Sequence, residues 1–155
     1  MTVVDQQQRL TALDPLRSFC VTAPAGSGKT ELLIQRYLTL FARVERPEQV
    51  LAITFTRKAA AEMRARVLEA LISAKAKDPC EGEHQQQTRR LAIEALGADE
   101  KGQWRLIGNI SRINIKTIDG YCAALTRQMP ILSEFGGQAD VIENASELYG
   151  EAVVE

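Results

Sequence analysis

Residues 23–30 read Ala-Pro-Ala-Gly-Ser-Gly-Lys-Thr, and these residue types in this order are typical of a phosphate site. A short apolar stretch (residues 18–22) precedes them and a helical pattern (residues 30–44) follows, so a strand, a glycine-rich turn and a helix are expected. Such a turn directs backbone N–H groups at an anion, and the N-terminus of the helix adds partial positive charge. The candidate ATP-binding residues of this turn, here named the cradle, are Ala23, Pro24, Ala25, Gly26, Ser27, Gly28, Lys29 and Thr30.

Two residues of the cradle could do chemistry. Lys29 would reach the β- and γ-phosphates, and the hydroxyl of Thr30 would hold Mg²⁺. At Gly26 and Gly28 a Cβ would block close approach of phosphate oxygens or forbid a positive φ. The alternative is an ordinary Gly/Ser turn with a solvated Lys29, which requires motif and context to coincide by accident. The sequence therefore predicts a nucleoside triphosphate and Mg²⁺ as ligands.

Composition sets the class of protein. The chain has 155 residues, 45% of them hydrophobic and 25% charged, which fits one globular domain. The formal net charge of −1 means that a nucleic-acid site must be a local patch. The three cysteines lack CxxC spacing and suit reduced thiols, and a single histidine argues against a histidine metal site or a catalytic triad. Because no signal pattern or membrane-spanning run is visible, we expect a cytoplasmic protein.

The coarse pattern alternates strands and helices. Helices are expected over residues 5–13, 30–44, 57–76, 88–97, 100–108 and 120–129. Strands are expected over residues 18–22, 50–55, 112–118 and 141–142, with a loop at 77–88, a turn at 136–137 and a final helix. The apolar run at 50–55 predicts a strand that is covered on both faces. Connections of this kind imply a parallel sheet, so the segments that leave the three main strands should line one rim.

The segment at residues 54–58 is chemically unusual. Thr56 is a plausible N-cap, yet Arg57 and Lys58 then occupy the first turn of a helix, where the helix dipole disfavours each cation by about 0.3–1 kcal/mol. A sequence that accepts this cost suits phosphates of a nucleic-acid backbone, and Arg64 and Arg66 would extend the charge. Phe55 is either a core residue or a stacking platform for a base. The two alternatives for Phe55 are equally compatible with composition.

Three segments together resemble the superfamily 1 DNA helicases of the UvrD/Rep type, most closely the RecB- and AddA-like exonuclease helicases. The first is the cradle, in which the family commonly has Ala at position 23. The second is Leu51-Ala-Ile-Thr-Phe-Thr-Arg-Lys-Ala-Ala-Ala-Glu-Met-Arg-Ala-Arg66, and the third is Ile115-Lys-Thr-Ile-Asp-Gly-Tyr-Cys122, continuing to Pro130. The resemblance implies an α/β fold, a P-loop (RecA-like) parallel sheet flanked by helices. Residues 1–140 would be the first part of motor domain 1A, with a helical insertion at about 77–110, and residues 141–155 would begin the helical 1B subdomain.

The resemblance also implies a function, namely an ATP-dependent motor that translocates on single-stranded DNA in repair and recombination. The residues that it places on the DNA path are Thr54, Phe55, Thr56, Arg57, Lys58, Thr117 and Asp119. The UvrD branch usually has His at position 119, whereas the RecB/AddA-like branch admits Asp. Asp119 could instead be the N-cap of the helix at 120–129. The family also places an adenine-reading glutamine upstream of the cradle, and its spacing selects Gln8 among Gln6, Gln7 and Gln8.

Other parts of such an enzyme are missing. Hydrolysis needs an acidic pair after an apolar strand, whereas Asp99 and Glu100 are expected in a polar turn and residues 141–144 lack the pair. The second RecA-like domain is also absent, so we expect an N-terminal fragment that does not hydrolyse ATP alone. The whole protein would be nucleoid-associated, with nuclease-complex subunits as partners. The alternatives are a small P-loop nucleotide or metabolite kinase and a non-catalytic ATP-binding module.

Overall fold

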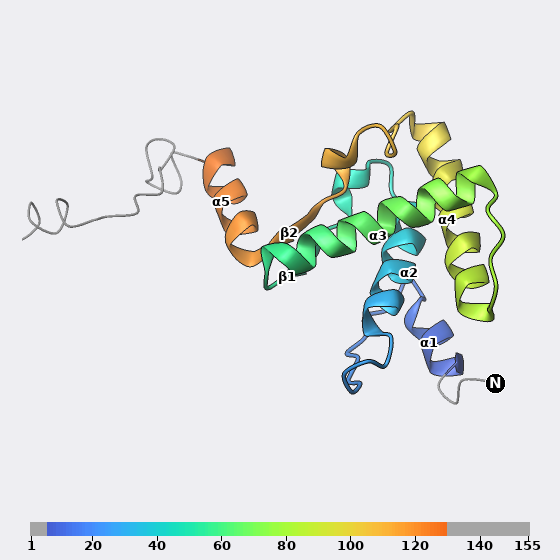
Figure 1. Ribbon diagram of the computed structural model, residues 1–155. Coiled ribbons are helices and arrows are strands. Elements are labelled where there is room, and N and C mark those ends of the chain that lie inside the picture. Colours follow the sequence, from blue (N-terminus) through green and yellow to red (C-terminus); the bar gives the residue numbers. More distant parts are fainter. Residues whose placement is uncertain (1–5, 130–155) are drawn as a thin grey trace, which may run out of the picture. The chain divides into compact units, whose positions relative to one another are not determined.

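The computed structural model describes residues 6–129. The chain divides into two compact units, residues 1–118 and 119–155, and each is described by itself. The first unit contains helices α1 (Gln6–Ala12), α2 (Lys29–Phe41), α3 (Arg57–Ala76) and α4 (Glu83–Gly102), strands β1 (Ala52–Thr54) and β2 (Ile115–Thr117), and 3-10 turns at Pro47–Gln49 and Ile110–Arg112 (Figure 1). Helix α5 (Ile118–Gln128) starts where the second unit begins.

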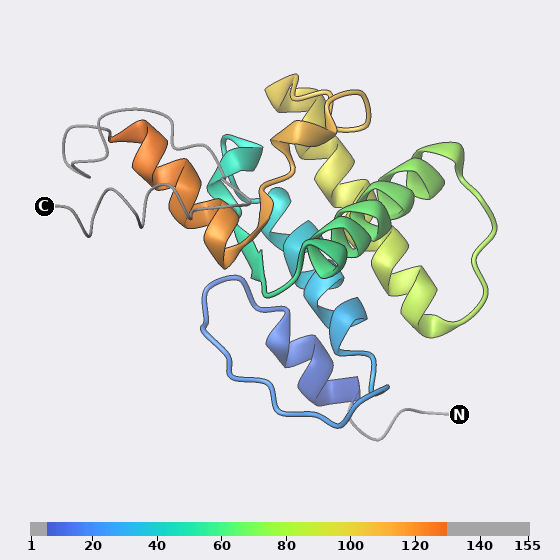
Figure 2. The same ribbon diagram turned by 60° about the vertical axis from the view of Figure 1, so that its left-hand side comes forward.

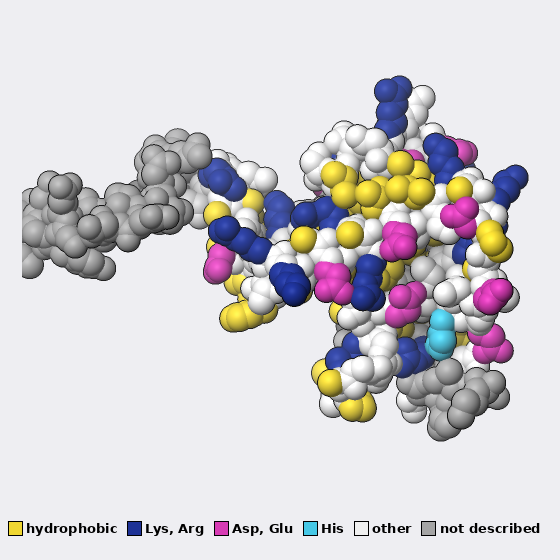
Figure 3. Space-filling model, in the orientation of Figure 1, with side chains coloured by type: hydrophobic (Ala, Val, Ile, Leu, Met, Phe, Trp, Pro, Cys, Tyr) yellow, Lys and Arg dark blue, Asp and Glu magenta, His cyan; other side chains and the backbone are white. Residues whose placement is uncertain are grey.

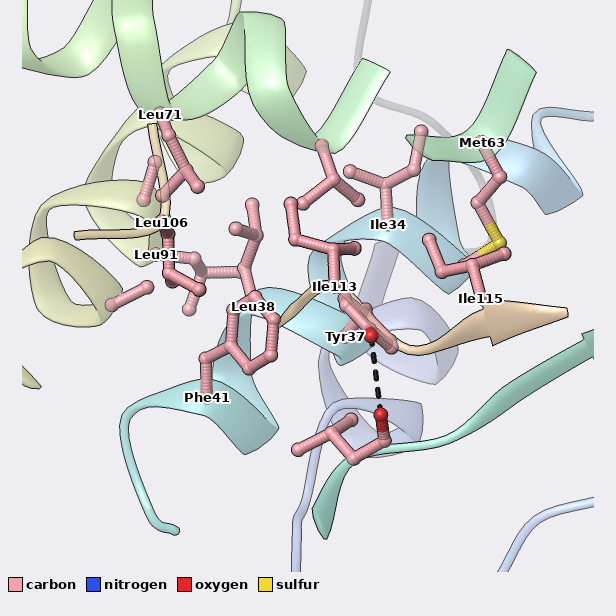
Figure 4. Packing of buried hydrophobic residues seen from close by; sticks show 14 of the residues in the cluster. Ile34, Tyr37, Leu38, Phe41, Met63, Leu71, Leu91, Leu106, Ile113 and Ile115 are labelled. Carbon is pink, nitrogen blue, oxygen red and sulfur yellow. Dashed lines mark hydrogen bonds between the residues drawn. The ribbon is translucent and has the colours of Figure 1, made fainter. Parts of the chain in front are cut away.

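Helix α3 is the centre of the first unit. It packs against α2 and α4, and its beginning contacts both strands (Figures 1 and 2). Apolar side chains from all of these elements form one core, in which full burial of each large side chain contributes about 1.5–3 kcal/mol (Figure 4). The labelled core residues are Ile34, Tyr37, Leu38, Phe41, Met63, Leu71, Leu91, Leu106, Ile113 and Ile115.

The predicted course of α3 is confirmed. Ala60, Met63, Val67 and Leu71 are all buried, at the spacing that places them along one face of a helix. Thr56 caps the helix as expected, because its hydroxyl oxygen accepts a hydrogen bond from the backbone N–H of Ala59 at 3.1 Å. The helix is rich in alanine, the strongest helix former, so its local preference and its packing agree.

Strands β1 and β2 pair in parallel, with Ala52 opposite Ile115 and Thr54 opposite Thr117. The expected parallel pairing is therefore confirmed for these two strands. The expectation that both faces of residues 50–55 are covered is wrong, because the side chain of Ile53 is 48% exposed. Helix α3 packs against this sheet, and no other described helix supplies a comparable second layer. An apolar run alone cannot distinguish a strand covered on one face from one covered on both.

The expected strand at residues 18–22 is absent from the described structure. Residues 18–24 have neither helical nor strand assignment, and Cys20, Val21 and Thr22 are exposed. A strand requires a neighbour for its ladder of hydrogen bonds, and the sheet of the described residues consists of β1 and β2. The apolar pattern of residues 18–22 therefore does not correspond to a paired strand.

One helix, α4, takes the place of the two predicted helices at residues 88–97 and 100–108. It begins at Glu83, within the expected loop at 77–88, and ends at Gly102, so residues 103–108 are not helical. Its interior contains Gly97, which weakens a helix by only about 1 kcal/mol relative to alanine and does not end it. Asp99 and Glu100 thus lie in the last turn of α4 rather than in a polar turn. The carboxylate of Asp99 accepts a hydrogen bond from the backbone N–H of Leu106 at 3.1 Å, which is a structural role.

The end of α4 is fixed by Trp104. Its indole Nε1 donates to the backbone oxygen of Glu45 at 3.2 Å, and its ring meets Phe41 edge to face with centroids 6.4 Å apart. Gly102 lies against the same ring, since a Cβ built at Gly102 would be 1.9 Å from Nε1 of Trp104. Trp104 can pack against the end of α4 because residue 102 has no side chain that would overlap the indole ring.

Helix α5 begins at Ile118, so Asp119, the first residue of the second unit, lies in the first helical turn. The alternative that Asp119 is the N-cap is therefore wrong, because the residue that precedes this helix is Thr117. The predicted turn at 136–137, the strand at 141–142 and the final helix lie outside the described residues. Within the described part of the chain, no helix has the length and apolar character that crossing a bilayer would need.

Candidate nucleotide site

The backbone of the cradle has the conformation that its glycines predict. Gly26 has φ of 77° and Gly28 has φ of 79°, both in the left-handed region that favours glycine. Gly28 is also the N-cap residue of α2. The first N–H groups of a helix have no carbonyl partner within the helix, so α2 presents donors at the cradle.

The side chain of Lys29 folds back over the cradle. Its Nζ donates to the backbone oxygen of Ala23 and to that of Pro24, each at 2.6 Å. Ser27 lies beside it, and among the described residues the hydroxyl of Ser27 is the buried side-chain polar atom that lacks a hydrogen-bond partner. A buried polar atom without a partner is unfavourable unless a ligand or water satisfies it, so this hydroxyl fits a site for an anion.

A cavity of about 380 Å³ lies between α1 and the cradle. Its wall includes Gln7, Gln8, Ser27 and Lys29, so one hollow contains both the candidate adenine reader and the candidate phosphate-binding lysine. Gln6 does not line the cavity, and its Nε2 instead donates to a carboxylate oxygen of Glu83 at 3.2 Å. Of the three candidates for the adenine-reading glutamine, Gln7 and Gln8 are thus the two that line the cavity.

The candidate magnesium ligand lies at the start of α2. Thr30 is exposed there, in the first turn of the helix. Its hydroxyl is therefore open to a ligand that binds at the cradle.

Two arginines that sequence reasoning missed contact this region. Arg9, on α1, donates from Nη2 to the backbone oxygen of Ser27. Arg36, on α2, donates to three backbone oxygens, at the end of α1 and in the segment that follows it. The sequence does carry a sign that Arg36 makes internal contacts. It lies between Gln35 and Tyr37 on a helix with an apolar face, and a partly buried cation needs hydrogen-bond acceptors.

The carboxyl ends of β1 and β2 lie at the same edge of the sheet, as expected for parallel strands. This places Thr54 and Thr117 opposite each other. The cradle does not extend from a strand, so the expectation that three strand ends form the rim is wrong for that segment. Asp119 belongs to the second unit.

Phe55 follows β1 directly and is 88% exposed. The alternative that it is a core residue is therefore wrong for this chain. An aromatic ring that stands in solvent beside two cations has the geometry of a platform for a base. Thr56 and Thr54 fix the local chain, since the hydroxyl of Thr54 donates to the backbone oxygen of Thr56 at 3.1 Å.

Arg57 and Lys58 are exposed, and Figure 3 shows basic side chains at the beginning of α3. Arg64 and Arg66, which the sequence predicts to extend this charge, each have a partner of their own. Arg64 donates to the backbone oxygen of Ile115 at 2.5 Å and so ties α3 to β2. Arg66 forms an exposed ion pair with Glu62, with Nη2 and Oε1 2.8 Å apart. That these two arginines extend the basic patch therefore stays a prediction.

Comparison with known proteins identifies the family. Residues 4–148 match the UvrD/REP helicase N-terminal domain, which is nearly the whole chain, so the chain belongs to this family. The AddA subunit of the ATP-dependent helicase/nuclease from Desulforamulus reducens is 34% identical over 111 residues, which cover 70% of this chain and 7% of that protein. The protein of the same name in Desulfitobacterium hafniense is 34% identical over 139 residues, covering 86% of this chain and 9% of that protein.

A shorter match links the chain to the UvrD branch. The ATP-dependent DNA helicase UvrD2 of Mycobacterium bovis is 47% identical over 65 residues, which cover 41% of this chain and 9% of that protein. The chain therefore spans less than a tenth of the length of these curated relatives. No solved structure matches the chain. The resemblance to UvrD/Rep and AddA-like helicases is confirmed, and the mixed α/β fold with its parallel strands is consistent with a helicase motor domain.

Proposed function

We propose that this chain is the ATP-binding first part of a helicase motor that translocates on single-stranded DNA. The observation that carries the proposal is the cavity that contains Gln8 and Lys29, bordered by a cradle with two glycines of positive φ. A cavity of about 380 Å³ suits a small ligand. Membership of the UvrD/REP family and the names of the relatives support ATP and DNA as ligands.

Different residues of the cradle would bind different parts of a nucleoside triphosphate. Backbone N–H groups at the start of α2 would bind phosphate oxygens, and Lys29 would exchange the oxygens of Ala23 and Pro24 for those of the β- and γ-phosphates. The Thr30 hydroxyl would bind Mg²⁺ together with the nucleotide, and the ion would neutralise charge on the phosphates. Gln8 would pair with adenine through its amide.

DNA would bind at the rim. We infer that Arg57 and Lys58 contact backbone phosphates, that Phe55 stacks on a base, and that Thr54, Thr56 and Thr117 lie on the same path. Asp119, in the second unit, is a further candidate for a DNA contact. Phosphate contacts carry no sequence information, which suits a motor that must move along any strand.

The complete enzyme would be much longer than this chain and would act in DNA repair and recombination. It would supply the acidic pair for hydrolysis, the second RecA-like domain and contacts to nuclease-complex subunits. It would act in the cytoplasm, associated with the nucleoid. Because those parts are needed to position charge around the transferred phosphoryl group, we propose that residues 1–155 alone bind ATP without turning it over.

Titration calorimetry of ATP with Mg²⁺ tests the nucleotide site. Lys29→Ala removes the point charge on the phosphates and should weaken ATP binding by about tenfold or more, which corresponds to about 1.4 kcal/mol. Lys75→Ala, an equal loss of charge in the last turn of α3, is the matched control and should bind like the wild type. Equal affinities of the Lys29→Ala variant and the wild type would remove the basis of the proposal.

A further inference from the structure

We propose that Arg36 is a positioning residue that holds α1 in place beside the cradle and so gives the nucleotide site its selectivity for the base. The inference rests on the proposed function, because it assigns base recognition to α1 and phosphate recognition to the cradle. It concerns a residue that lies further along α2 than Thr30 and that does not line the cavity.

The guanidinium of Arg36 spans the end of α1 and the turn after it. Nη1 donates to the backbone oxygen of Ala12 at 2.6 Å and to that of Asp14 at 3.1 Å, and Nη2 donates to that of Arg17 at 2.8 Å. Carbonyl groups at the end of a helix have no partner within it, and a cation is a favourable partner for them. Ala12 is the last residue of α1, and Asp14 and Arg17 lie in the segment after it, so the rigid fork of arginine joins the end of the helix to the turn that follows.

The same guanidinium also supports a wall of the cavity. Its carbon lies 5.3 Å from the centre of the Phe19 ring, and that of Arg17 lies 5.4 Å from the same centre. Phe19 lines the cavity together with Gln8. Arg36 therefore orders two parts of the chain that border the base side of the site, namely the end of α1 and the segment that carries Phe19.

Helix α1 is short and buries little of its surface. It has seven residues, and Ala12 is the one that is buried. An isolated helix of this length is not stable in water, so its position must come from tertiary contacts. Figures 1 and 2 show α1 beside α2. A second arginine contact runs in the opposite direction, from Arg9 on α1 to the backbone oxygen of Ser27 in the cradle.

In this arrangement the affinity for the phosphates and the affinity for the base come from different parts of the chain. The triphosphate would bind to the cradle and the start of α2, whereas the three hydrogen bonds of Arg36 go to residues 12, 14 and 17. The base would bind to the amide of Gln8, whose distance from the cradle is set by the two arginine contacts. Loss of the Arg36 fork should therefore reduce discrimination between bases and leave binding of a bare phosphate chain nearly unchanged.

The test compares three ligands, namely ATP, GTP and inorganic tripolyphosphate, each with Mg²⁺, by calorimetry on the 155-residue chain. Arg36→Met keeps the length and apolar contact of the side chain and removes all of its N–H donors. Arg43→Met, an exposed arginine just after α2, is the matched control. For Arg36→Met we expect ATP affinity to fall about tenfold, toward that of GTP, with tripolyphosphate within about twofold of the wild type. Arg43→Met should leave all three affinities unchanged.

Three results would overturn the inference: an unchanged ratio of ATP to GTP affinity in Arg36→Met, an equal fall for ATP and tripolyphosphate, and a wild type that does not distinguish the bases. A wild type that binds neither ATP nor tripolyphosphate would instead contradict the proposed nucleotide site itself. If Arg36→Met does not fold, as judged by circular dichroism, Arg36→Lys provides the same comparison. Lysine keeps the charge but cannot span three carbonyls, so it should show the same loss of base selectivity in smaller measure.

Discussion

The hydroxyl oxygen of Thr88 lies 2.5 Å from a carboxylate oxygen of Glu31, the residue that follows the candidate magnesium ligand Thr30. The same hydroxyl accepts a hydrogen bond from Nε2 of Gln35 at 2.9 Å, and the Gln35 side chain is buried. Thr88 lies on α4, and Glu31 and Gln35 lie on α2. A polar chain therefore joins α4 to the first turns of the helix that follows the cradle.

Thr88→Val should destabilise the protein by about 1–3 kcal/mol, because it keeps the shape of the side chain but leaves buried Gln35 without its best acceptor. Thr88→Ser retains the hydroxyl and should be close to the wild type. Unfolding in urea measures both. If Thr88→Val and Thr88→Ser unfold at the same midpoint, the hydroxyl does not contribute to the packing of α4 on α2.

Phe55→Ala should weaken binding of a single-stranded oligonucleotide by about 1–3 kcal/mol and leave folding unchanged. The side chain is 88% exposed, so its removal takes nothing from the core. Leu16 is similarly exposed, and Leu16→Ala serves as the control for loss of surface apolar area. Fluorescence anisotropy and circular dichroism give the two readouts. Undiminished DNA affinity in Phe55→Ala would mean that the ring is not a stacking platform.

Replacing both Arg57 and Lys58 with alanine should lower affinity for single-stranded DNA equally across sequences. The slope of log affinity against log salt should become shallower by about 1.4, since each lost phosphate contact contributes about 0.7 for single strands. Stability should rise at the same time, by about 0.3–1 kcal/mol per residue, because two cations leave the N-terminus of α3. A double variant with the wild-type salt slope would exclude this patch as the DNA site.

Stability should fall at alkaline pH because of Tyr37. Its hydroxyl donates to the backbone oxygen of Val50 at 3.1 Å, and burial raises the pKa of Tyr37 above its ordinary value (Figure 4). Since the folded pKa exceeds the unfolded one, the contribution of the protonated hydroxyl is complete below about pH 10. It is then lost by up to about 1.4 kcal/mol per pH unit as pH rises further.

Urea unfolding between about pH 8 and 12, roughly the range in which tyrosines titrate, measures this dependence. Other groups titrate in the same range, so Tyr37→Phe is the reference. Its free energy of unfolding should decline less steeply than that of the wild type. Parallel curves for the two proteins would show that Tyr37 titrates normally in the folded state.

Periodicity is sufficient to predict the long helices. The buried stripe of α3 and the alternate burial of Ile113 and Ile115 are both local patterns, although the strand itself is shorter than the predicted 112–118. Helix α2 does not follow one simple apolar stripe, because Leu33 is exposed, whereas Tyr37 and Phe41, four and eight residues further on, are buried. The buried surface of α2 is also wider than one stripe, since the helix packs against α4 as well as α3.

Features that depend on distant partners cannot be predicted in this way. Whether residues 18–22 pair as a strand is decided by a neighbouring strand, and whether Phe55 is buried is decided by what covers the end of β1. The three acceptors of Arg36 lie 19 to 24 residues away in sequence, so their approach follows from the packing of α1 and not from any local pattern. The types of the candidate site residues are legible in the sequence, whereas the contacts that hold them are not.

Exposed positions usually tolerate substitution, but the close contact of Gly102 with Trp104 makes position 102 an exception. Gly102 is exposed, and a survey of surface positions would class it as free to vary. Yet any other residue would place its Cβ inside the indole, and the ring is held by Phe41 on one side and by the oxygen of Glu45 on the other. In a library of single substitutions, position 102 should therefore be as intolerant as an interior position. The constraint on residue 102 is the indole ring of Trp104, two residues further along the chain.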